Sequence, residues 1–328
     1  MMRTMRKSGI FSSDPSNDPF EFRMKFFPNP SQMVMTTYTK QASSSFQEIP
    51  SISRPRKPVR YLVASDFDQT LSQNDSGHVL GEIMGIHDFE ARVKAVSDTH
   101  LVQQGAELAY LLRHDPEFRG VRREHLVEAG KRVKLKDNVE LLAEILAEPL
   151  EDVSFQFVVI SAGPREVVQS ALADIVPPEN VHGSEFDYDP ETGEICAVTK
   201  VPAGYGKVAV LQEQELKFET SPDHTIYIGD GSSDLYVMHH VNSRDGHTIA
   251  VSQTKDIGRI ARRTVMSENA MSVLAPILED VLKWNSRQIR ELFENHGLAL
   301  QGWDKIRTDW LTFHKAAVRP LKSVALAS

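Results

Sequence analysis

The chain has 328 residues, of which 25% are charged and 41% are hydrophobic, and its formal net charge is -8. This is an ordinary globular composition, and the length suits one large domain with an insertion or two domains. The acidic balance argues against broad electrostatic binding to nucleic acid or to an anionic membrane.

Charge is distributed unevenly along the chain. Residues 1–60 contain ten Lys or Arg and four Asp or Glu, so the remainder is strongly acidic. Residues 1–58 show no sustained helical or strand period and are rich in Ser, Pro and Asn, which predicts a disordered basic tail and linker. A transit peptide is the alternative interpretation. Cys196 is the single cysteine, so no intrachain disulfide can form, which fits a reducing compartment and a cytoplasmic location. No apolar run approaches the ~20 residues needed to span a bilayer.

A short apolar run, Tyr61–Ser65, predicts the first buried strand. Similar runs predict strands at Phe155–Ile160, His224–Ile228 and His247–Val251, and helical patterns between them cover 138–146, 164–175 and 235–241. Strand–helix alternation of this kind predicts an α/β fold, a Rossmann-like doubly wound parallel sheet with helices on both faces.

Residues 73–134 interrupt this alternation of strands and helices, because they contain no strand candidate. Their patterns predict helices at Gly77–Gly85, Phe89–Arg113 and Arg122–Val133, which together read as an inserted helical cap. Residues 183–200 predict two strands around a turn.

The C-terminal part is predicted to be helical. Apolar residues at a 3.6-residue period mark a helix at 273–282, and Trp303, Ile306, Trp310 and Phe313 predict another amphipathic helix. We expect these helices to pack on the core, and a homo-oligomer contact through them is the alternative.

The strongest chemical signal is an acid pair at the end of the first predicted strand, Asp66 and Asp68, within Ser-Asp-Phe-Asp-Gln-Thr. Ligands of open α/β sheets bind beyond the carboxyl ends of the strands. Two carboxylates spaced i, i+2 on extended backbone face the same way and repel each other unless a divalent cation, which prefers oxygen ligands, lies between them. As an isolated pair, Asp-x-Asp is more often an exposed turn.

A second acid pair, Asp230 and Asp234, lies in Gly-Asp-Gly-Ser-Ser-Asp after another apolar strand. Helix capping explains Asp234 well. It explains Asp230 poorly, because Asp230 precedes a glycine at the strand end.

Two further signals are weak when taken alone. Ser161 follows a strand and precedes a helix N-terminus, where a hydroxyl and free backbone N–H groups can bind an anion or simply cap the helix. Lys207 follows a glycine, but the surrounding residues do not match a P-loop, and a lone lysine is usually a solvated surface residue.

In sequence order, these signals resemble the haloacid dehalogenase-like hydrolase superfamily, in its phosphoserine phosphatase-like branch. The resemblance covers about residues 60–270 and rests on Asp66-Phe67-Asp68-Gln69-Thr70, Ser161, Gly206-Lys207 and Gly229-Asp230-Gly231-Ser232-Ser233-Asp234. The helical insertion after the first motif also matches that branch. Within this range the resemblance implies a catalytic core (59–72 and 135–270) and a helical cap (73–134), and composition and periodicity predict the basic tail (1–58) and a C-terminal helical extension (271–328).

The resemblance implies a phosphatase that acts on a small phosphorylated metabolite. Asp66 would be the nucleophile that becomes phosphorylated, and Asp68 the general acid and base. Mg²⁺ would be held by Asp66, the Asp68 carbonyl and Asp230, with Asp234 in support. The groups expected to bind phosphoryl oxygens are Ser161, Lys207 and Thr70.

Substrate recognition is expected at two positions where the chain departs from phosphoserine phosphatases. Asp75 stands where those enzymes have a Glu that binds the substrate amine, and Ser233 stands where an Asn is common. A substrate carboxylate would require a cap arginine; Arg92 and Arg113 are candidates, although ordinary solvated helix charge is the preferred interpretation of both. The rival functions are a phosphomutase of the same superfamily and a non-catalytic binding protein with the same fold.

Overall fold

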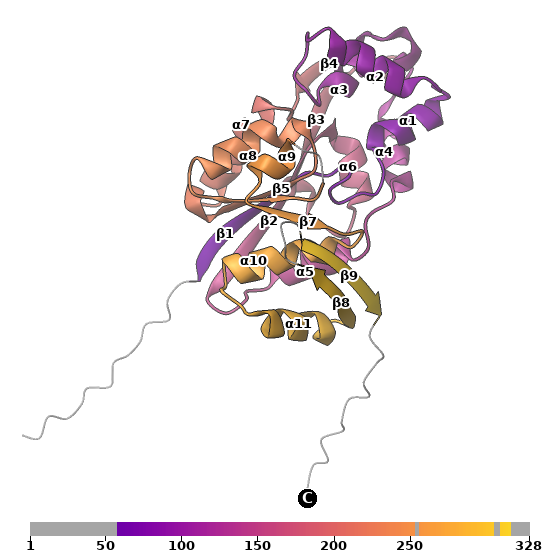
Figure 1. The fold of residues 1–328 in the computed structure, drawn as a ribbon. Coiled ribbons are helices and arrows are strands. Elements are labelled where there is room, and N and C mark those ends of the chain that lie inside the picture. Colours follow the sequence, from indigo (N-terminus) through magenta and orange to yellow (C-terminus); the bar gives the residue numbers. More distant parts are fainter. Residues whose placement is uncertain (1–57, 253–255, 305–308, 316–328) are drawn as a thin grey trace, which may run out of the picture. The chain divides into compact units, whose positions relative to one another are not determined.

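The computed structural model describes residues 58–252, 256–304 and 309–315, and the predicted tail at 1–58 lies outside them except for its last residue. The described residues form a sheet of nine strands in the order β4-β3-β2-β1-β5-β6-β7-β9-β8 (Figure 1). The strands are β1 (Val59–Ser65), β2 (Val153–Pro164), β3 (Val181–Tyr188), β4 (Ile195–Lys200), β5 (Thr225–Gly229), β6 (His247–Ala250), β7 (Arg263–Met266), β8 (Leu298–Asp304) and β9 (Asp309–Lys315). The two outermost pairs are antiparallel, and all other neighbours are parallel.

Helices cover both faces of the sheet. On one face lie α7 (Tyr205–Lys217), α8 (Leu235–Asn242) and α9 (Ile257–Ile260), and on the other lie α5 (Val139–Ala147), α10 (Leu274–Asp280) and α11 (Ser286–Asn295) (Figure 1). Leu62 and Ala64 of β1 pack in the hydrophobic cluster of α7 and α8, whereas Val63 packs in the cluster on the opposite face. The central strand is therefore apolar on both sides, and the predicted doubly wound α/β fold is confirmed.

The insertion after β1 is helical. It comprises α1 (Ser76–Met84), α2 (Phe89–Asp98), α3 (Glu107–His114) and α4 (Arg123–Arg132), which lie beyond one end of the sheet (Figure 1). The single helix predicted at Phe89–Arg113 is wrong, because α2 ends at Asp98 and α3 begins at Glu107. His100 and Gly105, between them, have φ values of 54° and 94°, which a continuing right-handed helix does not allow.

Shorter helices complete the described structure: α6 (Arg165–Ala171) and the 3₁₀ turns η1 (Pro116–Phe118), η2 (Pro178–Asn180), η3 (Pro222–His224), η4 (Ser232–Asp234) and η5 (Ala270–Val273). The helix α6 packs between β2, β3 and α4, and so connects the insertion to the sheet. No helix among the described residues has the length and apolar character to cross a lipid bilayer.

The predicted C-terminal helical extension is only half correct. Helices α10 and α11 are present, but the helix predicted from Trp303, Trp310 and Phe313 is instead an antiparallel pair, β8 and β9, and β9 pairs with β7. Ile306, the fourth residue of that pattern, lies outside the described residues. The apparent helical spacing arises because the aromatic residues come from two different strands. Leu298 and Leu300 show the true two-residue period, since both are buried.

Candidate functional site

The carboxyl ends of the three central strands bring the predicted acids together. In the register of the sheet, Ser65 at the end of β1 pairs with Val159 of β2 and with Ile228 of β5. The backbone N–H of Asp66 donates to the Ile228 carbonyl at 2.8 Å. Asp66, Ser161 and Asp230 therefore lie at the same edge of the sheet, where the strand order reverses and where open α/β sheets bind ligands.

A buried lysine joins the first and second acid motifs. Lys207, in the first turn of α7, is fully buried, and its Nζ lies 2.9 Å from Asp66 Oδ2 and 2.6 Å from Asp234 Oδ1. The hydroxyl of Tyr227, a residue of β5, also donates to Asp234 Oδ1, at 2.7 Å. The other oxygen of Asp234 accepts hydrogen bonds from the backbone N–H groups of Asp230 and Gly231.

Asp66, Asp230 and Asp234 each offer one carboxylate oxygen, and these oxygens lie within 4.8 Å of one another. Both oxygens of Asp234 are already hydrogen-bonded, so its carboxylate orients the loop and Lys207 more directly than it could bind a metal. Thr70, which was expected to bind phosphate, donates to Asp230 Oδ1 at 3.4 Å.

The acid cluster carries more negative charge than one lysine can balance. Burial, followed by repulsion from Asp234, raises the pKa of Asp66 well above its usual range. The same two causes raise the pKa of Asp230 to about 6. Burial alone would lower the pKa of Lys207, but the charges of Asp234 and Asp66 outweigh it, so the pKa of Lys207 is raised and the ammonium stays charged. A divalent cation with hard oxygen ligands fits this donor set, because it supplies the missing positive charge.

Asp68 has a different hydrogen-bond partner from Asp66. Its Oδ1 accepts from the Ser76 backbone N–H at 2.7 Å and its Oδ2 from the Ser76 hydroxyl at 3.0 Å. Burial, and next the charge of Asp75, raise the pKa of Asp68 to about 7. A carboxyl group that holds its proton up to neutral pH is suited to donate it to a leaving group.

Ser161 lies beside Asp68. The Ser161 hydroxyl is fully buried and accepts from the Gly163 backbone N–H at 3.0 Å. A Cβ placed on Gly163 would lie 3.2 Å from both Ser161 Oγ and Asp68 Oδ2, so the absence of a side chain there leaves space against the two polar groups. Ser161 lies inside β2, which continues to Pro164, and the helix expected after it, α6, begins at Arg165.

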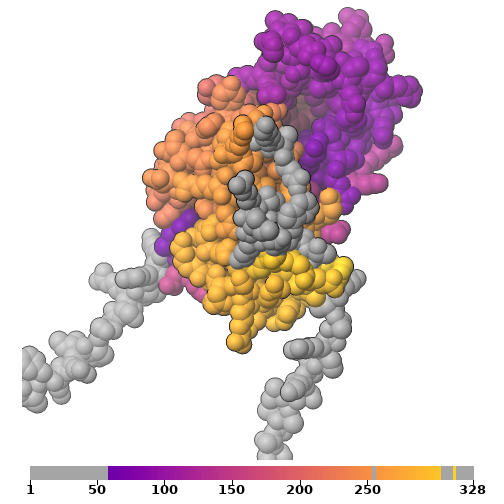
Figure 2. Space-filling model, in the orientation of Figure 1, coloured from indigo at the N-terminus to yellow at the C-terminus, as the bar shows by residue number. Residues whose placement is uncertain are grey.

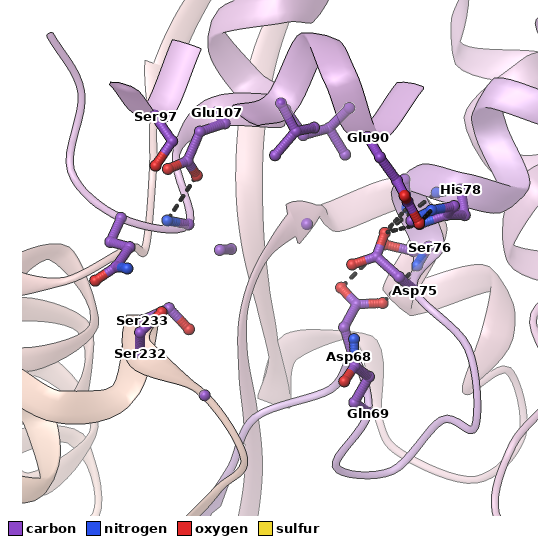
Figure 3. A pocket seen from close by; sticks show the side chains of 18 of the residues that line it. Asp68, Gln69, Asp75, Ser76, His78, Glu90, Ser97, Glu107, Ser232 and Ser233 are labelled. Carbon is purple, nitrogen blue, oxygen red and sulfur yellow. Dashed lines mark hydrogen bonds and ion pairs between the residues drawn. The ribbon is translucent and has the colours of Figure 1, made fainter. Parts of the chain in front are cut away.

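A cavity of about 560 Å³ opens above these residues, between the sheet edge and the helical insertion. Asp66, Asp68 and Asp230 line its floor, and residues of α1, α2 and the segment before α3 line the opposite side. Figure 3 shows Asp68 next to Asp75 and Ser76, with Ser97 and Glu107 facing Ser232 and Ser233 across the cavity. Figure 2 shows the insertion as the indigo and purple atoms next to the orange atoms of the sheet domain.

The two expected specificity residues, Asp75 and Ser233, both line the cavity. Asp75 also caps α1, since its Oδ1 accepts from the backbone N–H groups of Gly77 and His78. Arg92 and Arg113 do not line the cavity. Arg92 pairs with Asp88 and Asp115, each at 2.8 Å, and Arg113 borders a different depression, so neither side chain faces the cavity.

Sequence reasoning missed three residues of this site. Tyr227 was read as part of an apolar strand, and its position in β5 gave no sign that its hydroxyl meets Asp234. Ser76 follows Asp68 by eight residues, with no motif to connect them. Glu107 begins α3 and reaches the cavity only through the fold of the insertion.

Comparison with known proteins bears on the family and the fold of the chain. A family model described as haloacid dehalogenase-like hydrolase matches residues 63–239. No curated protein matches the chain.

Solved structures resemble the chain at low sequence identity. A substrate-bound phosphoserine phosphatase aligns with a TM-score of 0.53 and 15% identity, covering 66% of this chain and 97% of that one. A HAD family hydrolase from Salmonella enterica serovar Typhi gives 0.55 and 14%, covering 68% and 73%. A phosphoserine phosphohydrolase-like protein from Francisella tularensis gives 0.51 and 16%, covering 66% and 99%. The fold is thus that of the phosphoserine phosphatase-like branch.

Proposed function

Because the chain belongs to the haloacid dehalogenase-like hydrolase family, we propose that it is a magnesium-dependent phosphomonoester hydrolase that is phosphorylated on Asp66 during turnover. The observation that carries the proposal is the position of the Asp66 carboxylate. It lies at the floor of a cavity, hydrogen-bonded to a buried lysine, while Asp68 nearby has a pKa of about 7. A nucleophile, a proton donor and a cation are the groups that phosphoryl transfer requires.

The residues that would hold Mg²⁺ are Asp66 and Asp230 through their carboxylates and Asp68 through its backbone carbonyl. When bound, the ion neutralises charge on the acids and on the phosphoryl oxygens. Asp234 has the role of a positioning residue, since it binds Lys207 and two backbone N–H groups of the loop that carries Asp230. Thr70 positions the Asp230 carboxylate by the same kind of contact.

Asp66 attacks phosphorus, and the bond between phosphorus and the ester oxygen breaks as Asp68 gives its proton to the departing alcohol. Asp68, now a carboxylate, then takes a proton from the water that hydrolyses the phosphorylated Asp66. Ser161 and Lys207 hold the phosphoryl oxygens during both steps. The enzyme gains and loses no net proton, because Asp68 ends the cycle protonated as it began.

Residues 73–134 act in this proposal as the cap over a catalytic core formed by 59–72 and 135–270. The cavity between them accepts a small phosphorylated metabolite, since about 560 Å³ suits a small molecule better than a macromolecule. We also propose a cytoplasmic location. The single cysteine, Cys196, is exposed and forms no disulfide, which fits a reducing compartment.

The test is phosphate release from p-nitrophenyl phosphate by the full chain, with Mg²⁺ and with a chelator. We expect Asp66→Asn to lose activity by at least about a thousandfold, because the amide cannot act as the nucleophile. Chelation should abolish activity, and added Mg²⁺ should restore it.

The matched control is Asp152→Asn. Asp152 is exposed and lies at the amino end of β1, where its carbonyl accepts from the Val59 N–H, at the opposite end of the strand from Asp66. This variant should retain full activity. If Asp66→Asn still turned over, or if the folded protein released no phosphate from any ester in a broad panel, the proposal would be rejected.

A further inference from the structure

We propose that the substrate is a small phosphomonoester whose alcohol carries a primary ammonium group and no carboxylate, of the kind represented by phosphoethanolamine. This inference rests on the proposed phosphatase function and concerns the part of the cavity that faces away from the catalytic acids.

The insertion gives its side of the cavity an excess of negative charge. Asp75, Glu90, Asp98 and Glu107 all line the cavity, and Lys94 is the only Lys or Arg among the described residues that line it. The Lys94 ammonium is already bound by both oxygens of Asp98, at 2.9 and 2.7 Å. The charge of a bound phosphate would be met by Lys207 and a metal ion on the opposite side, so these carboxylates remain to attract a second, positive group on the substrate.

Glu107 is the residue that points most directly to a cationic ligand. It is 7% exposed, so its carboxylate is removed from most of the solvent. Its one hydrogen bond within the described structure comes from the Gly105 N–H to Oε2, at 2.7 Å, and no described cation pairs with it. A buried carboxylate without a cation is unfavourable, and an ammonium group in the cavity would supply the missing charge and donate to the second oxygen.

The Glu107 carboxylate lies on the side of the cavity that faces the core. Figure 3 shows it on the side of the cavity opposite Ser232 and Ser233, away from Asp68. Gly105, which holds Glu107, approaches the core so closely that a Cβ there would lie 2.9 Å from the Ser233 Cβ. The substrate amine would therefore be bound where the insertion meets the second acid motif.

A second acidic group lies nearer Asp68. The Glu90 carboxylate is 2.9 Å from His78 Nε2, and Asp75 lies 3.5 Å from the other ring nitrogen. The Asp75 side chain is 37% exposed and that of Glu90 is 83% exposed, so solvent screens both charges and they add less to the negative potential of the cavity than the buried Glu107 does.

The side of the cavity that the insertion forms disfavours a substrate carboxylate. None of the described residues that line the cavity is an arginine, and Arg92 is held outside it by Asp88 and Asp115. A carboxylate would therefore lie among like charges with no free cation to bind it. An ammonium group is also favoured over a quaternary one. Phe89 is the only Phe, Tyr or Trp among the described lining residues, and an aromatic cage would need several.

The experiment compares kcat/KM of the full chain with Mg²⁺ for phosphoethanolamine, propyl phosphate, O-phosphoserine and phosphocholine. Propyl phosphate replaces the ammonium with a methyl group of similar size. We expect phosphoethanolamine to exceed each of the other three by about tenfold or more. Glu107→Gln should reduce the phosphoethanolamine-to-propyl phosphate ratio by about tenfold, whereas Glu82→Gln, an equal charge change at an exposed residue of α1 outside the cavity, should keep the ratio.

Equal turnover of propyl phosphate and phosphoethanolamine, or a preference for phosphoserine or phosphocholine, would overturn this inference and leave the phosphatase proposal intact. Failure to hydrolyse any of the four esters or p-nitrophenyl phosphate would overturn both. The wild-type comparison needs no variant, so the inference can be tested even if Glu107→Gln does not fold.

Discussion

At the scale of single residues, the two acids of the first motif have been given different environments. Asp66 is tied to Lys207 at 2.9 Å, which keeps its carboxylate close to a positive charge. The Asp68 carboxylate accepts hydrogen bonds from the backbone N–H and the hydroxyl of Ser76, and Asp75 lies near enough to raise its pKa further. Two carboxyl groups two residues apart can therefore serve as nucleophile and proton donor.

This difference predicts a pH dependence. Because the pKa of Asp68 is raised to about 7, its proton is present below that pH and is lost above it. For an alkyl phosphate, whose alcohol needs the proton to leave, kcat/KM should fall as pH rises above about 7. Asp75→Asn removes a negative charge beside Asp68, so it should lower the pKa of Asp68 and move the falling limb to lower pH. A pH profile of kcat/KM with propyl phosphate measures the shift.

Asparagine is also a good N-cap, so Asp75→Asn should keep α1 folded. The matched control is Asp88→Asn, at the N-cap of α2, which lies outside the cavity and should leave the profile in place. An unshifted limb in Asp75→Asn would contradict the assigned role of Asp68 or the influence of Asp75 on it.

The sequence was sufficient to predict that Asp66 and Asp230 lie close together. The carboxyl ends of parallel strands meet at one edge of a sheet, whichever loops connect them. It could not predict Ser76, Tyr227 or Glu107 as site residues. Their contacts depend on how α1, β5 and α3 approach the edge, and no local spacing encodes that approach.

At the scale of elements, the segment between α2 and α3 is one of the places where the insertion contacts the core, in addition to the packing of α4 on α6. The Gln103 side chain accepts a hydrogen bond from the Tyr205 backbone N–H at 2.8 Å. Two residues later, Gly105 has a φ of 94° and packs against Ala162, Ala203 and Ser233. The segment thus fixes the position of Glu107 relative to the second acid motif.

Gly105→Ala should disturb this contact. The new methyl group would lie 2.9 Å from the Ser233 Cβ, closer than two carbons normally approach, and the backbone conformation is itself unfavourable for alanine. We expect a loss of about 1–3 kcal/mol in stability. We also expect kcat/KM for phosphate esters to fall by about tenfold, because a small displacement of the insertion misplaces the substrate. Denaturant unfolding and steady-state kinetics measure the two effects.

Gly120→Ala distinguishes the effect of the contact with Ser233 from the effect of general destabilisation. Gly120 is in the same insertion with a φ of 85°, but no atom lies within 4 Å of its added methyl group. We expect Gly120→Ala to lose a similar amount of stability from its unfavourable backbone conformation and to retain kcat/KM. Equal kinetic losses in both variants would show that general destabilisation, and not the contact with Ser233, limits turnover.

Several elements could not be predicted from local patterns. Helix α7 carries Lys207 on a buried face, but the sequence patterns predicted no helix there, and Gly204 and Gly206 lie at its start. Strand β7 has four residues and is stabilised by pairing with β6 and β9, contacts that are distant in sequence. Short strands of this kind depend on tertiary pairing, so propensity alone does not distinguish them from connections.

At the scale of the whole described molecule, the sheet continues beyond the part that matches the family, residues 63–239. Strands β6, β7, β9 and β8 extend it, and α10 packs beneath them. An ion cluster connects α10 to this extension. Asp280 lies 2.7 Å from His247 Nε2 of β6 and 3.0 Å from the Arg263 guanidinium of β7, and Arg263 also reaches Glu279 at 3.0 Å.

This cluster predicts how acid should affect stability. Burial would raise the pKa of Asp280, but the hydrogen bond from His247 and the charge of Arg263 outweigh it and lower the pKa below its usual value. The stabilisation is therefore complete above the unfolded-state pKa of about 3.9 and is lost as pH falls through the lower folded-state value. Asp280→Asn should cost about 1–3 kcal/mol at pH 7, and the difference from wild type should shrink below pH about 4.

Urea unfolding at pH 7 and at several values between 5 and 3 measures both effects. Asp245→Asn is the control, because Asp245 is 94% exposed and lies 3.9 Å from its partner Arg262, so its removal should change stability by less than about 0.5 kcal/mol. A constant difference between Asp280→Asn and wild type across this pH range would mean that the charge of Asp280 does not stabilise the fold. Apolar packing and the Arg263–Glu279 pair would then be left to hold α10 against the sheet extension.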